Sequence, residues 1–204
     1  MPNAIYLASR SPRRRELLRQ IGIAHEILLL REAAGRDTDI DESPHAGEAP
    51  LDYALRIATA KAERGAWVAA RRAALAAKPV LAADTTIALD GAIIGKPRDA
   101  ADAEHILRTL SGRNHTVITA VTVAHDGRIE SRVSTSQVRF APLEDPRIRR
   151  YIATGEPMDK AGAYAVQGRA AAFITHIEGS YSGIMGLPLA ETAELLARYG
   201  IETI

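Results

Sequence analysis

An acidic residue follows an apolar run in "PVLAADTTIALDG", residues 79–91. A carboxylate is costly inside a sheet unless it reaches a functional site or pairs with a cation. At the carboxyl end of a strand, where α/β sheets bind ligands, Asp84 can hold a divalent metal or accept a proton from water. The alternative is that the Asp84 side chain caps a turn. The pattern alone leaves both interpretations open.

Four arginines crowd "LASRSPRRRELL", residues 7–18, at the expected first turn of a helix. Cations are disfavoured there because the helix dipole already places partial positive charge at that end. A bound phosphate would reverse the cost, since the free backbone N–H groups and the guanidinium groups both donate to it. We therefore expect Arg13 and Arg14 to contact an anion, and Arg10 and Arg15 to face water.

Two segments approach known motifs without matching them. "GAIIGKP", residues 91–97, has three residues between its glycines instead of four and has Pro97 where a P-loop needs Ser or Thr. Lys96 can then contact phosphate only as a single placed charge. "GSYSG", residues 179–183, has Tyr181 at the position of a nucleophilic serine, which argues against a serine hydrolase.

The other candidate side chains lie in polar segments or on a helix. "TGEPMDKAGAYAVQG", residues 154–168, is a glycine-rich polar loop of a kind that often carries function. Its Gln167 can bind the edge of a nucleobase, because an amide both donates and accepts hydrogen bonds. Asp41 and Glu42 in "DES" and Lys61 in "ATAKA" are charges that are usually solvated in such positions.

The composition excludes several classes of protein. The chain has 204 residues, of which 47% are hydrophobic and 25% charged, and its net charge is +1. Attraction for phosphate must therefore be local. The absence of cysteine rules out disulfides, thiolate metal sites and cysteine nucleophiles, and the six histidines form no zinc-binding pair. No apolar run approaches the roughly 20 residues of a membrane span. With no signal peptide in view, we expect a cytoplasmic protein.

Short strands and helices alternate along the chain and must position these side chains. Ser11 as N-cap and Pro12 as the first helical residue predict one helix start, and the Asp126–Gly127 turn predicts a hairpin. We expect strands at 4–8, 26–30, 79–91, 93–94, 115–140 (the hairpin) and 171–178, helices at 12–20, 51–77, 99–110, 144–154 and 188–199, and a loop at 31–50. This order predicts an α/β protein with a mixed sheet, in one domain covering 1–204.

Seven stretches in this order resemble the Maf family of nucleoside triphosphate pyrophosphatases. They are "LASRSPRRRELL", "DES", "ATAKA", "AADTT", "GKPRDAADAEHILRTLSGRNHTVITAV", "TGEPMDKAGAYAVQG" and "IEGSYSGIMGLPL". The resemblance implies a twisted mixed sheet with flanking helices and two lobes around a cleft, similar to the inosine triphosphatase (Maf/Ham1) type. It also implies hydrolysis of a nucleoside triphosphate to the monophosphate and pyrophosphate with Mg²⁺ or Mn²⁺, a homodimer, and no nucleic-acid or membrane partner.

The resemblance also assigns roles to residues. Asp84 is implied as the proton acceptor that assists attack of water on the α-phosphorus, and Asp84 and Glu42 as the metal ligands. The segment before Glu42, residues 31–40, departs from the family pattern. The residues implied to surround the substrate are Ser9, Arg13, Arg14, Lys61, Thr85, Lys96, Lys160 and Gln167.

Three of these positions bear on the choice of base. Arg13, Thr85 and Gln167 resemble the branch of the family that acts on dTTP and UTP, whereas the 7-methyl-GTP branch usually has Trp and Glu at positions 13 and 167. We therefore expect hydrolysis of dTTP, UTP or modified pyrimidine triphosphates. The cellular role, whether removal of non-standard nucleotides or restraint of cell division, stays open.

Two other classes of function compete with this expectation. A nucleic-acid-binding or regulatory protein would use the arginine run as its contact surface, but the charge is near zero and there are only two Phe and one Trp beside six Tyr. A structural partner in cell division would have no need of Asp84, Lys61 and Lys96.

Overall fold

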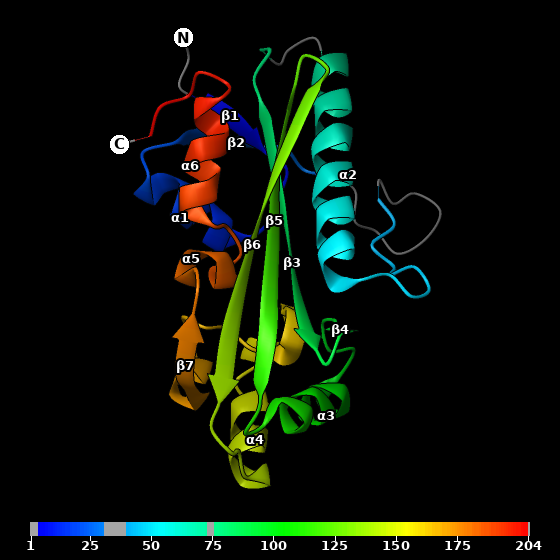
Figure 1. The fold of residues 1–204 in the computed structure, drawn as a ribbon, viewed down its shortest axis with the longest axis vertical. Coiled ribbons are helices and arrows are strands. Elements are labelled where there is room, and N and C mark those ends of the chain that lie inside the picture. Colours follow the sequence, from blue (N-terminus) through cyan, green and yellow to red (C-terminus); the bar gives the residue numbers. More distant parts are fainter. Residues whose placement is uncertain (1–3, 31–39, 73–75, 204) are drawn as a thin grey trace.

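The structure, a computed structural model, describes residues 4–30, 40–72 and 76–203. Over these residues a seven-stranded mixed sheet runs in the order β2-β1-β3-β5-β6-β7, with β4 paired to β3 (Figure 1). The strands are β1 (Ala4–Leu7), β2 (Ala24–Ile27), β3 (Val80–Leu89), β4 (Ala92–Ile94), β5 (Asn114–His125), β6 (Arg128–Phe140) and β7 (Ile174–Glu178). The helices are α1 (Pro12–Gln20), α2 (Pro50–Arg71), α3 (Ala100–Leu110), α4 (Asp145–Ile152), α5 (Tyr181–Met185) and α6 (Leu189–Ala197), with 3₁₀ helices η1 (Glu156–Asp159), η2 (Ala161–Ala163) and η3 (Arg169–Phe173).

Three long antiparallel strands, β3, β5 and β6, form the centre of the sheet and run most of the length of the molecule (Figure 1). Helix α2 lies along one face of these strands, and its Ala54 and Ala58 pack against Ile118 and Ala120 of β5. Alanines on the buried side let the helix approach the sheet closely. None of the helices in the described ranges has the length and apolar character that crossing a bilayer requires.

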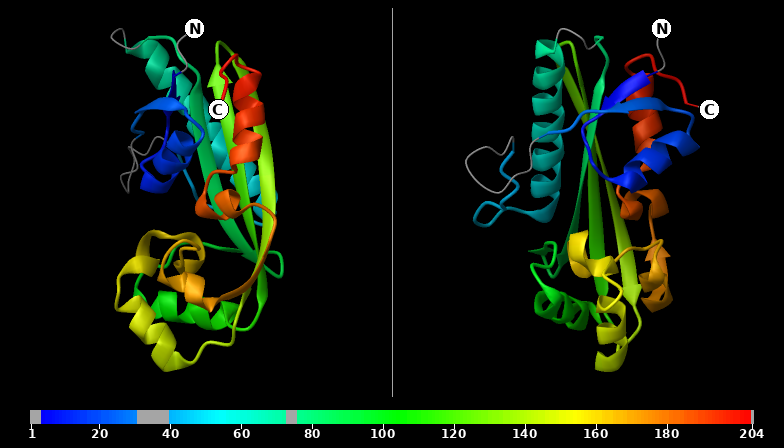
Figure 2. Two further views of the ribbon diagram at one scale, coloured as in Figure 1. Left: turned by 90° about the vertical axis from the view of Figure 1, so that its left-hand side faces the viewer. Right: turned by 180° about the vertical axis from the view of Figure 1, so that it is seen from behind.

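The remaining elements gather into two lobes (Figure 2). In one lobe α1 and α6 pack on the sheet around buried Leu18, Leu81 and Leu195. In the other lobe α3, α4 and the 3₁₀ helices surround the far ends of β5 and β6, with Leu107 and Phe140 in the core. The mixed sheet with flanking helices and the two-lobed shape confirm the predicted fold class.

An edge of β3 is left open between two short strands. Strand β1 is parallel to β3 and pairs with it as far as Leu81, whereas β4 is antiparallel and pairs with it from Ile87 onward. Between these points the described residues place no strand on that edge of β3. Asp84 and Thr85 lie in this stretch, so side chains from both faces of the sheet can reach one opening.

Several predicted elements differ from the structure at their ends. The strand predicted at 26–30 is 24–27, because its partner β1 ends at Leu7, which pairs with Ile27. The helix predicted to reach 77 ends at Arg71, and residues 73–75 lie outside the described part, as do residues 31–39 of the predicted loop. Residues 171–173 are 3₁₀ helix instead of strand, and α5 was not expected.

Candidate active site

A cavity of about 880 Å³ lies between the two lobes at the open edge of β3. Every residue predicted to act in the site lines it, although these residues come from distant parts of the chain. They are Ser9, Arg13, Arg14, Glu42, Lys61, Asp84, Thr85, Lys96, Lys160 and Gln167. The structure thus brings the whole predicted set together, and the role of each residue stays a prediction.

Asp84 lies in the middle of β3 with 8% of its surface exposed, so it caps no turn. Its Oδ1 accepts a hydrogen bond of 2.8 Å from Nζ of Lys61, which comes from α2. The same Nζ lies 2.8 Å from Oε1 of Glu42. One ammonium group therefore holds two carboxylates from separate segments, which offsets the cost of burying them.

The charges around Glu42 favour its ionised form. Burial acts to raise the pKa of the Glu42 carboxyl, but the charge and hydrogen bond of Lys61 and the charges of Lys96 and Arg14 together lower that pKa below its ordinary value. Tyr53 donates a 2.8 Å hydrogen bond to the Glu42 backbone carbonyl and so fixes this segment against α2. Burial, with the charges of Asp84 and Glu42, raises the pKa of Tyr53 to about 12.

The two carboxylates suit a divalent cation that is shared with a substrate. Glu42 and Asp84 already converge on one cationic atom, Nζ of Lys61. No cluster of three or more His, Asp or Glu able to hold a metal occurs within residues 4–30, 40–72 and 76–203. Mg²⁺ is commonly bound by one or two carboxylates with substrate phosphates and water completing its shell. The donor set fits that mode of binding.

Arg14 connects four segments at one wall of the cavity. Its Nε donates to the Gly186 carbonyl at 2.7 Å, its Nη1 to Ser9 Oγ at 3.1 Å and its Nη2 to Thr85 Oγ1 at 3.3 Å. Gly186 ends α5 with φ of +116°, a conformation that favours glycine. Ser11 caps α1 as predicted, accepting from the Arg14 N–H. The guanidinium is thereby aimed into the cavity.

Several residues of this site carry no signal in the sequence. Thr119 Oγ1, on the neighbouring strand β5, lies 3.0 Å from Thr85 Oγ1 and 2.8 Å from the Gly183 carbonyl, and so helps to fix the Thr85 side chain. Tyr164 lines the cavity, and its hydroxyl lies 2.8 Å from Nε2 of buried His115. These contacts join positions 34 to 64 residues apart, which no local pattern could reveal.

Arg13 and Lys160 face the cavity from opposite lobes. Lys160 Nζ donates to the Glu156 backbone carbonyl at 2.6 Å and forms an ion pair with Asp159. Burial acts to raise the pKa of Asp159, but the hydrogen bond from Lys160, its charge and that of Arg13 together lower it. Opposite charges, Arg13 from α1 and Asp159 from η1, therefore line the same cavity.

The other two arginines of the first helix segment differ from each other. Arg10 is exposed, as predicted, yet its Nη2 donates to the Leu30 carbonyl at 3.4 Å. Arg15, which was predicted to face water, is half-buried and does not line the cavity.

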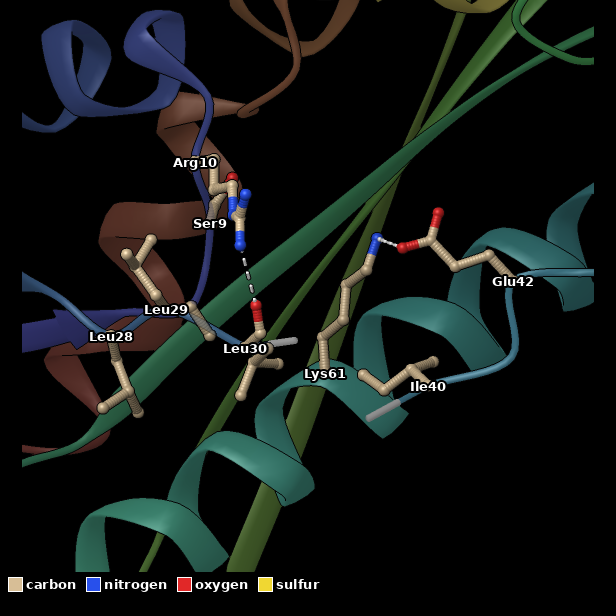
Figure 3. A pocket seen from close by; sticks show the side chains of 9 residues that line it. Ser9, Arg10, Leu28, Leu29, Leu30, Ile40, Glu42 and Lys61 are labelled. Carbon is tan, nitrogen blue, oxygen red and sulfur yellow. Dashed lines mark hydrogen bonds and ion pairs between the residues drawn. The ribbon is translucent and has the colours of Figure 1, made fainter. Parts of the chain in front are cut away.

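A second, small cavity of about 20 Å³ adjoins the site, and Lys61 and Glu42 line both. Figure 3 shows the side chains of Lys61 and Glu42, which line it, directed toward each other, and Arg10 reaching the Leu30 carbonyl. Leu28 and Ile40 supply part of its apolar lining. This space has the size of about one water molecule.

The cavity is positively charged although the chain is almost neutral. Among the described residues that line it, six side chains are cationic and four are anionic. The cationic ones are Arg10, Arg13, Arg14, Lys61, Lys96 and Lys160, and the anionic ones are Asp41, Glu42, Asp84 and Asp159. The local excess of positive charge suits a phosphate-bearing ligand.

Known proteins resemble this chain over almost its whole length. A protein named dTTP/UTP pyrophosphatase from Nitrosomonas europaea is 56% identical over 98% of this chain and 96% of its own length. Proteins of the same name from Aromatoleum aromaticum and Ralstonia nicotianae are 59% and 57% identical, covering 96% and 97% of this chain and 95% and 94% of their own lengths.

Among solved structures, the Staphylococcus aureus Ham1 protein is similar over 96% of this chain and 97% of its own, with a TM-score of 0.49 and 16% identity. The model of the family described as Maf-like protein matches residues 4–199. This chain therefore belongs to the Maf-like protein family.

Proposed function

We propose that this protein is a nucleoside triphosphate pyrophosphatase that hydrolyses dTTP and UTP to the monophosphate and pyrophosphate. The observation that carries the proposal is the convergence of Asp84, Glu42 and six cationic side chains on one cavity between the lobes. The relatives at 56–59% identity, which are named for this activity, support it.

The reaction needs an acceptor for one proton. A water oxygen forms a bond to the α-phosphorus while the bond from that phosphorus to the bridging oxygen of the β-phosphate breaks. We assign to Asp84 the proton that the water loses, because its carboxylate is the acidic group nearest the middle of the open edge of β3. The displaced group leaves as pyrophosphate.

The cationic side chains hold the substrate and neutralise the leaving group. Phosphoryl transfer depends mainly on positioning and charge. Arg14 presents a forked, pre-aimed guanidinium, whereas Lys61 and Lys96 act as point charges. Glu42 and Asp84 would hold a divalent cation, which would supply further charge neutralisation and make the attacking water more acidic. The dependence of the hydrolysis on Mg²⁺ or Mn²⁺ is part of this proposal.

The base is selected by side chains on the wall of the cavity. Gln167 is exposed on the cavity wall, between the buried Val166 and the half-buried Gly168. Its amide can donate to and accept from the complementary edge of thymine or uracil. Arg13 and Thr85 are the other specificity positions of the proposal.

The test is a turnover panel over common and modified triphosphates with Mg²⁺ or Mn²⁺, scored for monophosphate and pyrophosphate. We expect dTTP and UTP to be the preferred substrates. Asp84→Asn should lower kcat by about 10³-fold or more, since general-base catalysis contributes roughly 10²–10⁴-fold, while circular dichroism shows an intact fold. Turnover by this variant within a few-fold of the parent would contradict the role of Asp84.

A homodimer is a separate part of the proposal and rests on the family resemblance. Sedimentation velocity over a range of concentrations tests it. A species of one chain's mass, 21.9 kDa, at all concentrations would contradict the dimer and leave the proposed activity untouched.

A further inference from the structure

The carboxylate of Glu156 lies outside the proposed reaction centre and accepts three neutral donors. The Tyr151 hydroxyl donates to Oε1 at 3.0 Å, the Arg169 N–H to Oε2 at 3.0 Å, and the Ala170 N–H to Oε1 at 3.5 Å. The two N–H groups begin the 3₁₀ helix η3. The side chain of Glu156 thus caps, across 13 and 14 residues of sequence, a turn that it does not belong to.

The residue at position 168 makes this contact possible. Gly168 has ordinary backbone angles, φ of −100° and ψ of −156°, so a positive φ does not explain its lack of a side chain. A Cβ at this position would lie 2.3 Å from Glu156 Oε1 and 2.6 Å from its Cδ. Glycine is needed here because the carboxylate passes directly over the backbone.

The turn that Glu156 caps follows directly from Gln167. On the other side of Gln167, residues 163–166 are buried, and the Tyr164 hydroxyl is held at 2.8 Å from His115 Nε2. The Gly168 N–H donates to the Ala165 carbonyl at 3.0 Å and closes the turn around Gln167. The direction of the exposed Gln167 side chain is therefore set by a fixed segment before it and by Glu156 after it.

Glu156 also contacts Lys160, the other residue of this lobe that is proposed to bind the substrate. Its backbone carbonyl accepts the 2.6 Å hydrogen bond from Lys160 Nζ. One residue thereby contacts both the Lys160 ammonium, through its backbone, and the turn carrying Gln167, through its carboxylate. Neither contact places Glu156 itself among the residues that line the cavity.

We infer that Glu156 is a positioning residue that fixes the Gln167–Arg169 turn and so determines which nucleobase the cavity accepts. The inference rests on the proposed function, in which Gln167 binds the base. Glu156 acts by removing alternative directions of the Gln167 amide before the nucleotide arrives, which lowers the cost of ordering that side chain on binding.

The test compares Glu156→Ala with Gln167→Ala and with the double variant. We expect Glu156→Ala to raise KM for dTTP and UTP and to reduce the preference for them over purine triphosphates by about tenfold, with a smaller loss in kcat. Because Glu156 acts through Gln167, the double variant should be no less selective than Gln167→Ala alone. Additive losses would overturn the inference.

A second pair of variants makes the test independent of folding losses. Glu156→Gln keeps the volume and one acceptor oxygen, so we expect selectivity between that of the parent and that of Glu156→Ala. Gly168→Ala forces the carboxylate aside and should reproduce the Glu156→Ala profile. Glu104→Ala is the matched control, since Glu104 is a partly buried carboxylate of the same lobe bound to Arg108 and Arg149; its selectivity should equal that of the parent.

The outcomes separate the inference from the proposed function. A parent protein that leaves dTTP and UTP intact would overturn the proposed function itself. A parent protein that hydrolyses them, with unchanged selectivity in Glu156→Gln and Gly168→Ala, would overturn the inference and leave the function standing.

Discussion

The three acceptors around the Arg14 guanidinium come from β1's end, from β3 and from the turn after α5. The Gly186 carbonyl lies 172 residues from Arg14 in sequence, and Thr85 lies 71 away. The crowding of arginines at a helix start predicts an anion site without showing which arginine serves it. Arg14 is aimed inward by acceptors that only the fold supplies, and Arg10 and Arg15 have none of these three. At this scale, residue types predict the chemistry but not the direction of each side chain.

The carboxylates show the same limit. Asp84 could be selected from the sequence because a charge in an apolar strand demands an explanation. Its pairing with Lys61 could not, since a lysine on a polar helix face is ordinarily solvated and nothing local marks Lys61 as reaching β3. The family resemblance supplied Lys61 and Glu42, and the structure supplies the single ammonium that joins the two acids.

Gln167 gives the prediction that belongs to single residues. In Gln167→Glu the side chain keeps its shape but can no longer donate to a base carbonyl at neutral pH. We expect kcat/KM for dTTP and UTP to fall by at least about tenfold, measured by release of pyrophosphate.

The matched control is Gln137→Glu, which makes the same change at an exposed residue of β6 bonded to Thr116. It should leave the nucleotide profile unaltered. A profile that is also unaltered in Gln167→Glu would show that Gln167 does not contact the base.

At the scale of elements, Arg14 acts as a joint between α1, β3 and α5. Arg14→Lys retains the charge but loses the planar fork that reaches three acceptors at once. We expect a loss of about 2 kcal/mol in the free energy of unfolding, since a hydrogen bond contributes about 1 kcal/mol and a buried acceptor left unpaired costs more. Urea denaturation measures it.

Arg19→Lys is the control for this change, because Arg19 lies on the same helix with 64% of its side chain exposed and pairs only weakly with Glu16. Its stability should stay within about 0.5 kcal/mol of the parent. Equal losses in the two variants would mean that Arg14 does not join these elements.

The ends of the elements show what the sequence could predict and why. The start of α1 was predictable because Ser11 and Pro12 form a local capping signal, and the β5–β6 hairpin because Asp126–Gly127 forms its turn. The end of β2 depends on where its partner β1 stops, and η3 replaces the expected strand start because Glu156 caps its N–H groups. A single sequence shows local capping and turn residues, but it does not show element ends that depend on contacts with residues far along the chain.

His115 at the start of β5 predicts how stability changes with pH. Burial lowers the pKa of His115 to about 4, against 6.5 for the free side chain. Between pH 6.5 and 4 His115 is protonated in the unfolded chain but stays neutral in the folded chain. The free energy of unfolding therefore falls as the pH drops toward 4. The full effect is about 3 kcal/mol, at 1.36 kcal/mol per unit of pKa.

The measurement is the free energy of unfolding between pH 7 and pH 4 in the parent and in His115→Gln. We expect the parent to lose up to about 3 kcal/mol more than the variant over this interval. His105→Gln, at an exposed histidine of α3, should keep the parent's slope. Parallel curves for the parent and His115→Gln would contradict a neutral, buried His115.

At the scale of the whole molecule, the site exists because β1 and β4 share one edge of β3 without meeting. The two lobes attach on either side of that gap and contribute their cationic residues from opposite directions. The sequence could order the pieces of the site along the chain, and the resemblance could name them. The gap itself depends on the lengths of three strands, which the sequence predicted only to within a few residues.

The same strands that frame the gap also tie the lobes together. Val117 of β5 belongs to the core of one lobe, and Val121 and Val123 of the same strand belong to the core of the other. If the core of one lobe unfolded, its end of β5 would lose its packing. The same strand contributes to the core of the other lobe, so that core would be weakened too. We therefore propose that residues 1–204 unfold as one cooperative domain.

Calorimetry of two matched variants tests this cooperativity. Leu107→Ala and Leu18→Ala each remove a fully buried leucine, one from each lobe, and should cost about 2–5 kcal/mol. In a cooperative domain either variant lowers the temperature of one and the same unfolding transition, by about 10 °C given 2–4 °C per kcal/mol for a chain of this size. The calorimetric and van't Hoff enthalpies of that transition stay equal. If the lobes unfolded separately, each variant would instead shift only one of two transitions. Because β5 passes through both cores, a cavity in either lobe weakens the support of the strand on which the other is built, and we expect the single transition.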